Sequence, residues 1–166
     1  SDLADISADR VKIVLPDFEM PAGGVHIRWP DTALEQEARL FDYKWYAALA
    51  YIRANRLNHN VIESANDRYG IMASGKAYND TRQALVDLGL DDATCQRVGI
   101  RVHKVSVVWP LEAQTTREFA KGLQEILVVE EKRQIIEYQL KEELYNWPDA
   151  MRPRIVGKFD EMEGDD

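Results

Sequence analysis

The 166-residue sequence has little cysteine, no long apolar run and no excess of basic residues. Cys95 is the only cysteine, which excludes an internal disulfide, a thiolate zinc site and an iron–sulfur cluster. No stretch approaches the roughly 18 apolar residues that read as a membrane-spanning helix. Lys and Arg number 21 against 29 Asp and Glu, and a net charge of −8 would repel a phosphate backbone. The sequence therefore predicts a protein that binds no nucleic acid and does not enter a membrane.

The single cysteine is typical of a reducing compartment. The first apolar run, Val11–Leu15, is too short for a secretory signal and has acidic flanks, so we expect a cytoplasmic protein. With 45% apolar and 30% charged residues, the composition is that of one globular domain with an arm. The sequence begins at Ser1 rather than Met, and we therefore expect a processed chain or a fragment of a longer one.

The first part of the chain, residues 1–30, predicts a strand and a wrapping arm. Val11–Leu15 is rich in β-branched residues and is stopped by a proline, and turn-forming Pro and Gly residues follow. Large apolar side chains, among them Phe18, Ile27 and Trp29, lie within this stretch. An arm with such side chains is expected to lie on a surface.

A long helix is predicted over Thr32–Leu57. Thr32 is followed three residues later by Glu35, which is the spacing of a capping box. Apolar side chains recur every three or four residues and form one stripe. The stripe consists of Leu34, Ala38, Phe41, Trp45, Leu49 and Ile52. Core packing is the favoured interpretation of the stripe, and a partner interface, to which its aromatic residues are suited, is the alternative.

Apolar strands alternate with amphipathic helices over the rest of the chain. Strands are predicted at Tyr69–Ser74, Ile100–Val108, Ile126–Val129 and Arg154–Val156. Helices are predicted at Lys76–Leu88, Asp91–Val98, Glu112–Gly122 and Arg133–Tyr145. This alternation is typical of an α/β fold with a mostly parallel sheet covered on both faces. We expect residues 31–160 to form a single α/β domain and residues 161–166 to form a frayed acidic tail.

One motif matches the spacing of a phosphate-binding loop, G-x-x-x-x-G-K, at Gly70–Ala77. We reject that interpretation because Ala77 stands where the motif needs Ser or Thr, and because Ile71–Ser74 is predicted to be a strand. A strand followed by Gly75 and a helix start remains, where backbone N–H groups and Lys76 would meet an anion. The alternative is a tight strand-to-helix turn that needs glycine.

Two further strand ends carry candidate residues. Glu130, Glu131, Lys132 and Arg133 follow an apolar strand, at the place where ligands and interfaces gather in open α/β sheets, and these four charges would orient a partner loop or a substrate. The alternative for them is a solvated turn whose acids favour the start of the next helix. Trp109 closes another strand, where packing is its ordinary role and ligand contact is the alternative. His103 alternates with valines and is predicted to be a sheet histidine.

Six blocks of the sequence are weak singly but distinctive when taken in order. They are Gly75–Tyr78, Ala84–Gly89, Trp109–Glu112, Glu125–Arg133, Gln139–Asn146 and Val156–Asp160. Together with Pro21–Gly24 and Ile27–Pro30, these blocks resemble an internal segment of the indolepyruvate ferredoxin oxidoreductases of the long fused-chain bacterial type. The resemblance covers about residues 10–160.

The resemblance implies a domain similar to the carboxy-terminal domain of transketolase, a three-layer α/β/α sandwich with a mostly parallel sheet and an antiparallel edge strand. Val128–Glu131 is similar to the strand end in the corresponding domain of other thiamine enzymes. The parent enzyme would oxidatively decarboxylate an aryl-pyruvate such as indolepyruvate to an acyl-CoA. Thiamine diphosphate, Mg²⁺ and an iron–sulfur cluster or ferredoxin would serve it as cofactors.

The sequence departs from the whole enzyme in lacking the Gly-Asp-Gly…Asn stretch that holds Mg²⁺ and the cofactor diphosphate. The resemblance therefore implies a non-catalytic supporting domain that binds no cofactor itself and packs against neighbouring thiamine-binding domains. Neither a catalytic residue nor a metal ligand is assigned. The candidates for substrate or interface contact are Lys76, Tyr78, Trp109, Glu130 and Glu131.

Two functions of other classes stay open beside this one, and so does the question whether the isolated chain is an enzyme. One is a free-standing α/β domain that binds a small anionic or phosphate ligand at the Gly75–Lys76 turn. The other is a scaffold without chemistry that forms a homodimer through the aromatic helix.

Overall fold

The computed structural model describes residues 12–158 of the chain. The chain divides into two compact units, which are Ser1–Arg56 and Leu57–Asp166. The domain boundary thus differs from the one expected after residue 30, because the long helix is grouped with the arm rather than with the α/β domain. The acidic tail predicted at residues 161–166 lies outside the described residues.

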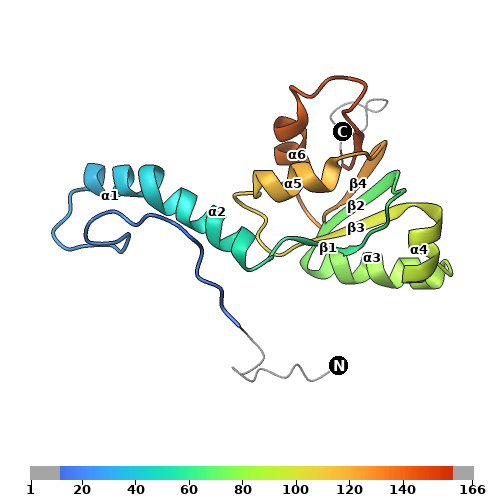
Figure 1. Cartoon of the computed structure of the whole chain (residues 1–166), viewed down its shortest axis with the longest axis horizontal. Helices are drawn as coiled ribbons and strands as arrows, with labels where there is room; N and C mark the ends of the chain where they lie inside the picture. Colours follow the sequence, from blue (N-terminus) through green and yellow to red (C-terminus); the bar gives the residue numbers. More distant parts are fainter. Residues whose placement is uncertain (1–11, 159–166) are drawn as a thin grey trace. The chain divides into compact units, whose positions relative to one another are not determined.

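The first unit consists of an irregular arm and one helical segment (Figure 1). The segment comprises α1 (Ala33–Arg39), a π-helical turn η2 (Leu40–Lys44) and α2 (Trp45–Ala54). Thr32 caps α1 as predicted: its hydroxyl accepts from the N–H of Glu35, and the Glu35 carboxylate accepts from the N–H of Thr32. The predicted helix is confirmed, although it ends three residues earlier than Leu57.

The strand predicted over Val11–Leu15 is wrong for residues 12–15. Val14 instead bonds to the side-chain amide of Asn55, whose Oδ1 accepts from the Val14 N–H and whose Nδ2 donates to the Val14 carbonyl, each at 2.8 Å. One side chain supplies both partners, so no ladder of backbone hydrogen bonds forms along the segment.

The apolar stripe of the helical segment lies mostly at the surface. Of its six residues only Ile52 is buried, whereas Leu34 and Phe41 are more than half exposed. Core packing, the interpretation that the periodicity favours, is therefore wrong for the exposed half of the stripe, which is Leu34, Ala38 and Phe41. The physical reason is that one helix and an irregular arm supply no second layer that would close a core.

The second unit is built on a five-stranded sheet with the order β1-β3-β2-β4-β5. Its strands are β1 (His59–Ile62), β2 (Tyr69–Ser74), β3 (Ile100–Val105), β4 (Glu125–Val129) and β5 (Arg154–Val156). β2 runs parallel to β3 and to β4, β4 runs parallel to β5, and β1 pairs antiparallel with β3 at the edge. The mostly parallel sheet with an antiparallel edge strand is confirmed.

Helices cover both faces of this sheet (Figure 1). α3 (Gly75–Asp87) and α4 (Asp92–Val98) lie on one face, and α5 (Ala113–Ala120) and α6 (Ile136–Leu144) lie on the other. Strand side chains alternate between the faces and so build two apolar clusters. The smaller cluster joins Leu85 and Cys95 to Ile62 and Val102, and the larger includes Phe119. This is the expected three-layer α/β/α sandwich.

Within residues 12–158, no helix has both the length and the apolar character that crossing a membrane requires.

Gly70, in the central strand β2, allows α5 and its following turn to approach the sheet closely. A Cβ at this position would lie 2.6 Å from Leu123 Cδ1 and 2.8 Å from Phe119 Cζ, which is closer than real contacts allow. Phe119 and Leu123 belong to the larger apolar cluster, and both are buried. The missing side chain of Gly70 is therefore part of the packing of this face.

Arg101, at the amino-terminal end of β3, joins the connection that precedes β2 to the end of α5. Arg101 Nε lies 2.9 Å from Asp67 Oδ2, and the same guanidinium donates to the backbone carbonyls of Phe119 and Lys121. Burial alone would raise the pKa of Asp67, but hydrogen bonds from Ser64 and the pairing with Arg101 outweigh it and lower that pKa.

His103 is the sheet histidine that the sequence predicts. It is 2% exposed, and its ring centroid lies 4.8 Å from that of Phe119. Its Nδ1 lies 2.7 Å from Oδ1 of Asn60 on β1, so Nδ1 carries the proton and donates, while the buried Nε2 has no hydrogen-bond partner among residues 12–158. Burial, with smaller contributions from His59 and Arg101, lowers the pKa of His103 from 6.5 to about 3.

The buried neutral state of His103 predicts that acid destabilises the fold. The unfolded histidine gains its proton near pH 6.5 and the folded one only near pH 3, so its contribution is complete above pH 6.5 and declines as the pH falls. We expect this residue to lower the free energy of unfolding by about 2 kcal/mol between pH 7 and pH 5. Urea denaturation at both pH values measures the change.

Two variants separate this residue from the rest of the protein. His103→Gln should lose this component of the pH dependence, whereas His26→Gln, at an exposed position, should keep it. An equal pH dependence in His103→Gln and in the unchanged chain would contradict the account.

Candidate functional site

The carboxyl ends of β2 and β4 meet where the connections of the sheet diverge. After β2 the chain enters α3 on one face of the sheet and continues toward β3 (Figure 1). After β4 it enters α6 on the other face and continues toward β5. Adjacent parallel strands with diverging connections leave a crevice at their carboxyl ends, where ligands bind in open α/β sheets. A pocket of about 580 Å³ lies there, within the size range of small-molecule sites.

Three of the five sequence-predicted candidates line this pocket. Lys76 comes from the first turn of α3, and Glu130 and Glu131 follow directly after β4. Val108, beyond the end of β3, and Ile135 add apolar walls. The structure thus brings together residues that lie more than 50 positions apart in the sequence, and their contact with a substrate or partner stays a prediction.

Glu130 holds the start of α6. Its Oε1 accepts from the backbone N–H groups of Ile135 at 2.9 Å and Ile136 at 2.8 Å, and its Oε2 accepts from that of Glu137 at 3.1 Å. Ile135, at the N-cap position of α6, has no side chain that would satisfy these donors. For Glu130 the structure therefore shows the alternative that the sequence left open, an acid that favours the start of the following helix.

Lys76 is exposed and pairs with Asp80 one turn further along α3. The hydrogen bond and the charge of Asp80 raise the pKa of Lys76, and Glu131 adds a smaller contribution in the same direction. Lys76 is therefore a permanent cation at the pocket and not a base. The backbone carbonyl of Glu131 accepts from Lys158 Nζ at 3.3 Å, and its side chain is exposed.

Lys132 and Arg133 are the two cations of the charged run after β4, and neither is among the five candidates for substrate or interface contact. Both are exposed and line the pocket, and within residues 12–158 no side chain or carbonyl bonds to either of them. With Lys76 they give the lining three cations against the carboxylates of Glu130 and Glu131. The sequence does carry the signal, because both follow β4 directly in the Glu-Glu-Lys-Arg run.

Trp109 lies on a loop that is held on both sides. Asn58 Oδ1 accepts from the two N–H groups of residues 106–107, at 2.9 and 3.0 Å. Gln139 on α6 donates at 2.8 Å to the carbonyl that precedes Trp109, and it accepts at 2.8 Å from the N–H two residues after it. The Trp109 side chain is 59% exposed. An exposed tryptophan on a fixed loop is typical of a protein interface rather than of a core.

Tyr78 lies outside the pocket. It is partly buried on α3 against the smaller apolar cluster, and Lys104 Nζ lies 5.2 Å from the centroid of its ring. The sequence groups it with Lys76, but residues two positions apart on a helix point to different sides. The structure therefore assigns Tyr78 a packing contact with the sheet.

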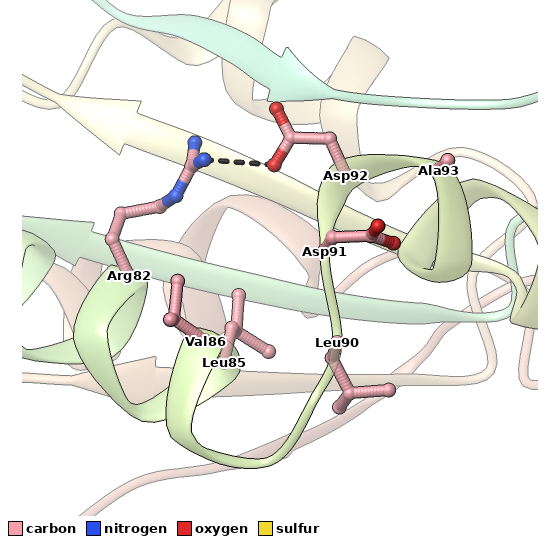
Figure 2. A pocket seen from close by; sticks show the side chains of 7 residues that line it. All are labelled: Arg82, Leu85, Val86, Leu90, Asp91, Asp92 and Ala93. Atoms are coloured by element: carbon pink, nitrogen blue, oxygen red, sulfur yellow. Dashed lines mark hydrogen bonds and ion pairs between the residues drawn. The ribbon is translucent and has the colours of Figure 1, made fainter.

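A second pocket, of about 370 Å³, lies between α3 and α4 (Figure 2). Leu85, Val86 and Leu90 form its apolar part, and Arg82 pairs with Asp92 across it at 2.8 Å. Cys95 on α4 is fully buried, and burial raises the pKa of its thiol, which is typical of an unreactive cysteine.

The fold and its crevice define an open α/β domain, and comparison with known proteins gives its family. Residues 58–166 match the model of the indolepyruvate ferredoxin oxidoreductase middle domain, and the chain belongs to this family. The match covers nearly the whole second unit. It confirms the family that the six sequence blocks predict.

Two curated relatives are both described as indolepyruvate oxidoreductase subunit IorA. The protein of Methanothermobacter marburgensis is 35% identical over 86 residues, which is 52% of this chain and 13% of the relative. That of Thermococcus kodakarensis is 30% identical over 105 residues, which is 63% of this chain and 15% of the relative. The chain thus spans a small part of the length of these relatives.

A solved structure also resembles the chain. It is a 2-oxoglutarate:ferredoxin oxidoreductase from Magnetococcus marinus with 2-oxoglutarate, coenzyme A and succinyl-CoA bound. The TM-score is 0.47 at 14% identity, over 95% of this chain and 25% of that one.

The hydrogen bonds of Glu130 predict a loss of stability when they are removed. Glu130→Ala leaves three N–H groups at the start of α6 without their acceptor, and we expect the free energy of unfolding to fall by about 1–2 kcal/mol. Glu131→Ala, the matched control at the next position, removes an exposed side chain and should stay within about 0.5 kcal/mol of the unchanged chain. Chemical denaturation measures both, and equal effects would show that Glu130 is not a helix cap.

Proposed function

We propose that the second unit is a supporting domain of a thiamine-diphosphate-dependent indolepyruvate ferredoxin oxidoreductase. The complete enzyme would oxidatively decarboxylate indolepyruvate or a related aryl-pyruvate to an acyl-CoA, with ferredoxin as the electron acceptor. Membership of the middle-domain family supports this assignment. The chain covers 13–15% of the length of the curated relatives, so most of such an enzyme would lie on other domains.

The main support for this role comes from the hydrogen bonds that the Glu130 carboxylate accepts. Both of its carboxylate oxygens hold α6, although it stands at the strand end where an acid or base would act on a ligand. Asn58 and Gln139 likewise use their amide groups to fix the neighbouring loop. The polar groups at this edge therefore stabilise a shape, which is what a surface that positions other domains requires.

The described residues offer few ligands to the Mg²⁺ ion that accompanies thiamine diphosphate. Between residues 12 and 158, no group of three or more His, Cys, Asp or Glu side chains is placed to hold a metal ion. Of the two carboxylates at the pocket, that of Glu130 is engaged by α6. In the proposal, thiamine diphosphate is accordingly held by other domains.

A second candidate function is the binding of an organic anion in the pocket. Lys132 and Arg133 favour it, because they are exposed cations at a concave surface of a chain whose net charge is −8. Lys132 and Arg133 would form charge-assisted hydrogen bonds with a carboxylate or phosphate ligand there. Val108 and Ile135 would contact the apolar part of such a ligand.

Thermal unfolding of this chain in the presence of ligands tests the supporting role. A bound ligand at 100 times its dissociation constant stabilises a protein by about 2.7 kcal/mol, which is readily measured. We expect no shift of the midpoint with thiamine diphosphate and Mg²⁺, or with indolepyruvate. A shift with thiamine diphosphate would overturn the supporting role, because it would place the cofactor in this unit.

The same assay tests the second candidate with pyrophosphate and coenzyme A as probes. If the pocket binds anions, both probes should raise the midpoint, and Lys132→Ala/Arg133→Ala should abolish at least half of the rise. Arg97→Ala/Lys121→Ala removes two exposed cations away from the pocket and should leave it unchanged. An equal response of the two double variants would exclude the pocket as the binding site.

A further inference from the structure

The first unit exposes large apolar side chains that its own residues do not cover. Trp29 is 98% exposed, Leu34 is 77% exposed and Ile27 is 72% exposed, and Phe41 and Tyr46 are each 56% exposed. Among the described residues of this unit, only Ile52 is buried. Exposed apolar surface on this scale marks an interaction site, because a segment of this size without a core gains little stability of its own.

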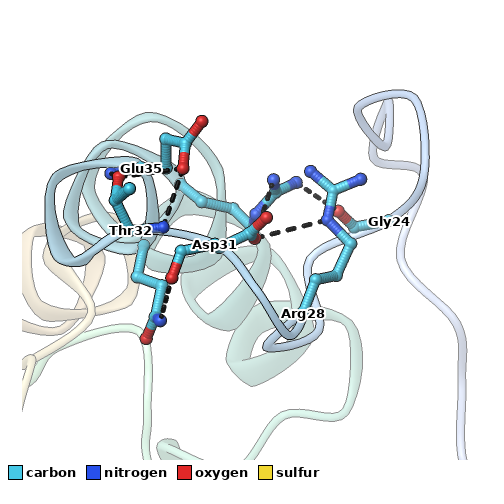
Figure 3. A network of polar contacts seen from close by, with 7 residues as sticks. Gly24, Arg28, Asp31, Thr32 and Glu35 are labelled. Carbon is cyan, nitrogen blue, oxygen red and sulfur yellow. Dashed lines mark hydrogen bonds and ion pairs between the residues drawn. The ribbon is translucent and has the colours of Figure 1, made fainter.

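The surface has a defined conformation despite the missing core. Asp31 accepts from both Arg28 and Arg39, each at 3.4 Å, and Arg39 also donates to the carbonyl of Gly24 at 3.1 Å (Figure 3). The side chains of Asp31 and Arg39 are largely buried in this network. Together with the capping box of Thr32, the network ties the loop that carries Trp29 to the start of α1.

This network constrains the backbone that carries Trp29 and leads into α1. A surface that is ordered before binding loses less conformational entropy when it is covered. Trp29, Phe41 and Tyr46 are also residue types that dominate the energetics of protein interfaces. The first unit therefore has the two properties of a docking surface, exposed aromatic anchors and a framework that orders them.

We propose that the first unit docks through Ile27, Trp29, Leu34 and Phe41 onto a domain of the same polypeptide that lies outside residues 1–166. This inference rests on the proposed function, in which this chain is part of a longer enzyme. It adds the surface through which the segment before the middle domain would be joined to the rest of that enzyme.

Two observations favour another domain of the same polypeptide over a second copy of this chain. The family match begins at residue 58, so the first unit precedes the middle domain and lies outside it. The curated relatives are several times longer than the matched segment, so further domains would be tethered close by. Tethering raises the effective concentration of such a domain to the millimolar range, whereas a second copy must associate from dilute solution.

The charges of the first unit agree with this occupant. Residues 12–56 contain six Lys and Arg and six Asp and Glu, so this stretch has no net charge. A neutral surface with apolar anchors neither steers nor repels a charged partner over a distance. Such a surface suits a permanent contact with an apolar face rather than recruitment of a nucleic acid or a charged peptide.

Hydrogen exchange of the α1 and α2 amides tests the proposal, measured on this chain alone and on the complete enzyme that contains it. We expect exchange to be about tenfold slower or more in the complete enzyme, because docking suppresses local opening. Equal rates in the two samples would overturn the proposal. Slow exchange already in the isolated chain would also overturn the proposal. If light scattering then gave the mass of a dimer, a second copy of the chain would cover the surface. If it gave the mass of a monomer, the second unit would cover it.

Matched variants of the complete enzyme assign the protection to the surface. Trp29→Ala/Leu34→Ala should abolish most of the slowing, whereas Glu37→Ala/Asp42→Ala, which alters exposed acidic residues of the same helical segment, should leave it in place. Unchanged protection in the first variant would overturn the assignment. Binding of thiamine diphosphate to the second unit would overturn the supporting role alone, so the two failures are distinguishable.

Discussion

The close contact of α5 with the central strand sets the geometry of the second unit. Gly70 has no side chain, so Phe119 and Leu123 pack directly on β2, while α3 covers its other face. β2 is thereby flanked by two parallel strands and enclosed by helices. Because α3 and α6 leave the sheet on opposite faces, a crevice opens between β2 and β4. The pocket follows from this topology rather than from any single residue that lines it.

Buried and partly buried carboxylates complete the unit by holding its helix ends. Glu112 is 1% exposed and accepts from two N–H groups in the first turn of α5, and Glu130 does the same for α6. Glu137, also 1% exposed, accepts from the N–H of Lys158 and pairs with Lys141. All three carboxylates thus act as structural groups, and of these only Glu130 is among the candidates for substrate or interface contact. This use agrees with a domain that presents a fixed surface to its neighbours.

The layered fold was accessible from the sequence because strong local signals agree with the tertiary structure. Tyr69–Ser74 and Arg154–Val156 form strands with the predicted bounds, since they are apolar runs between clear turn signals. The sequence analysis does not predict β1, because the polar residues His59 and Asn60 make up half of this four-residue edge strand. The strand is stabilised by its pairing with β3, which the local sequence does not indicate. The strand prediction near Val14 is wrong for the opposite reason. The residues there favour a β-strand, but among residues 12–158 no strand pairs with them.

The candidate site was only partly accessible. Strand-end positions led to Lys76, Glu130 and Glu131, because carboxyl ends of parallel strands converge whatever their distance in the chain. That the Glu130 carboxylate would reach the start of α6 depends on loop geometry that periodicity does not encode. The division after Arg56 was equally hidden, because an amphipathic stripe indicates burial without indicating what buries it.

In the proposed function, this domain presents the rigid carboxyl edge of its sheet to other domains of a complete enzyme. A cryo-electron microscopy map of the complete enzyme tests it most directly. The account predicts that Trp109 is buried against another domain, that Glu130 still caps α6, and that thiamine diphosphate is held elsewhere. A map with Trp109 in solvent and thiamine diphosphate between the ends of β2 and β4 would contradict it.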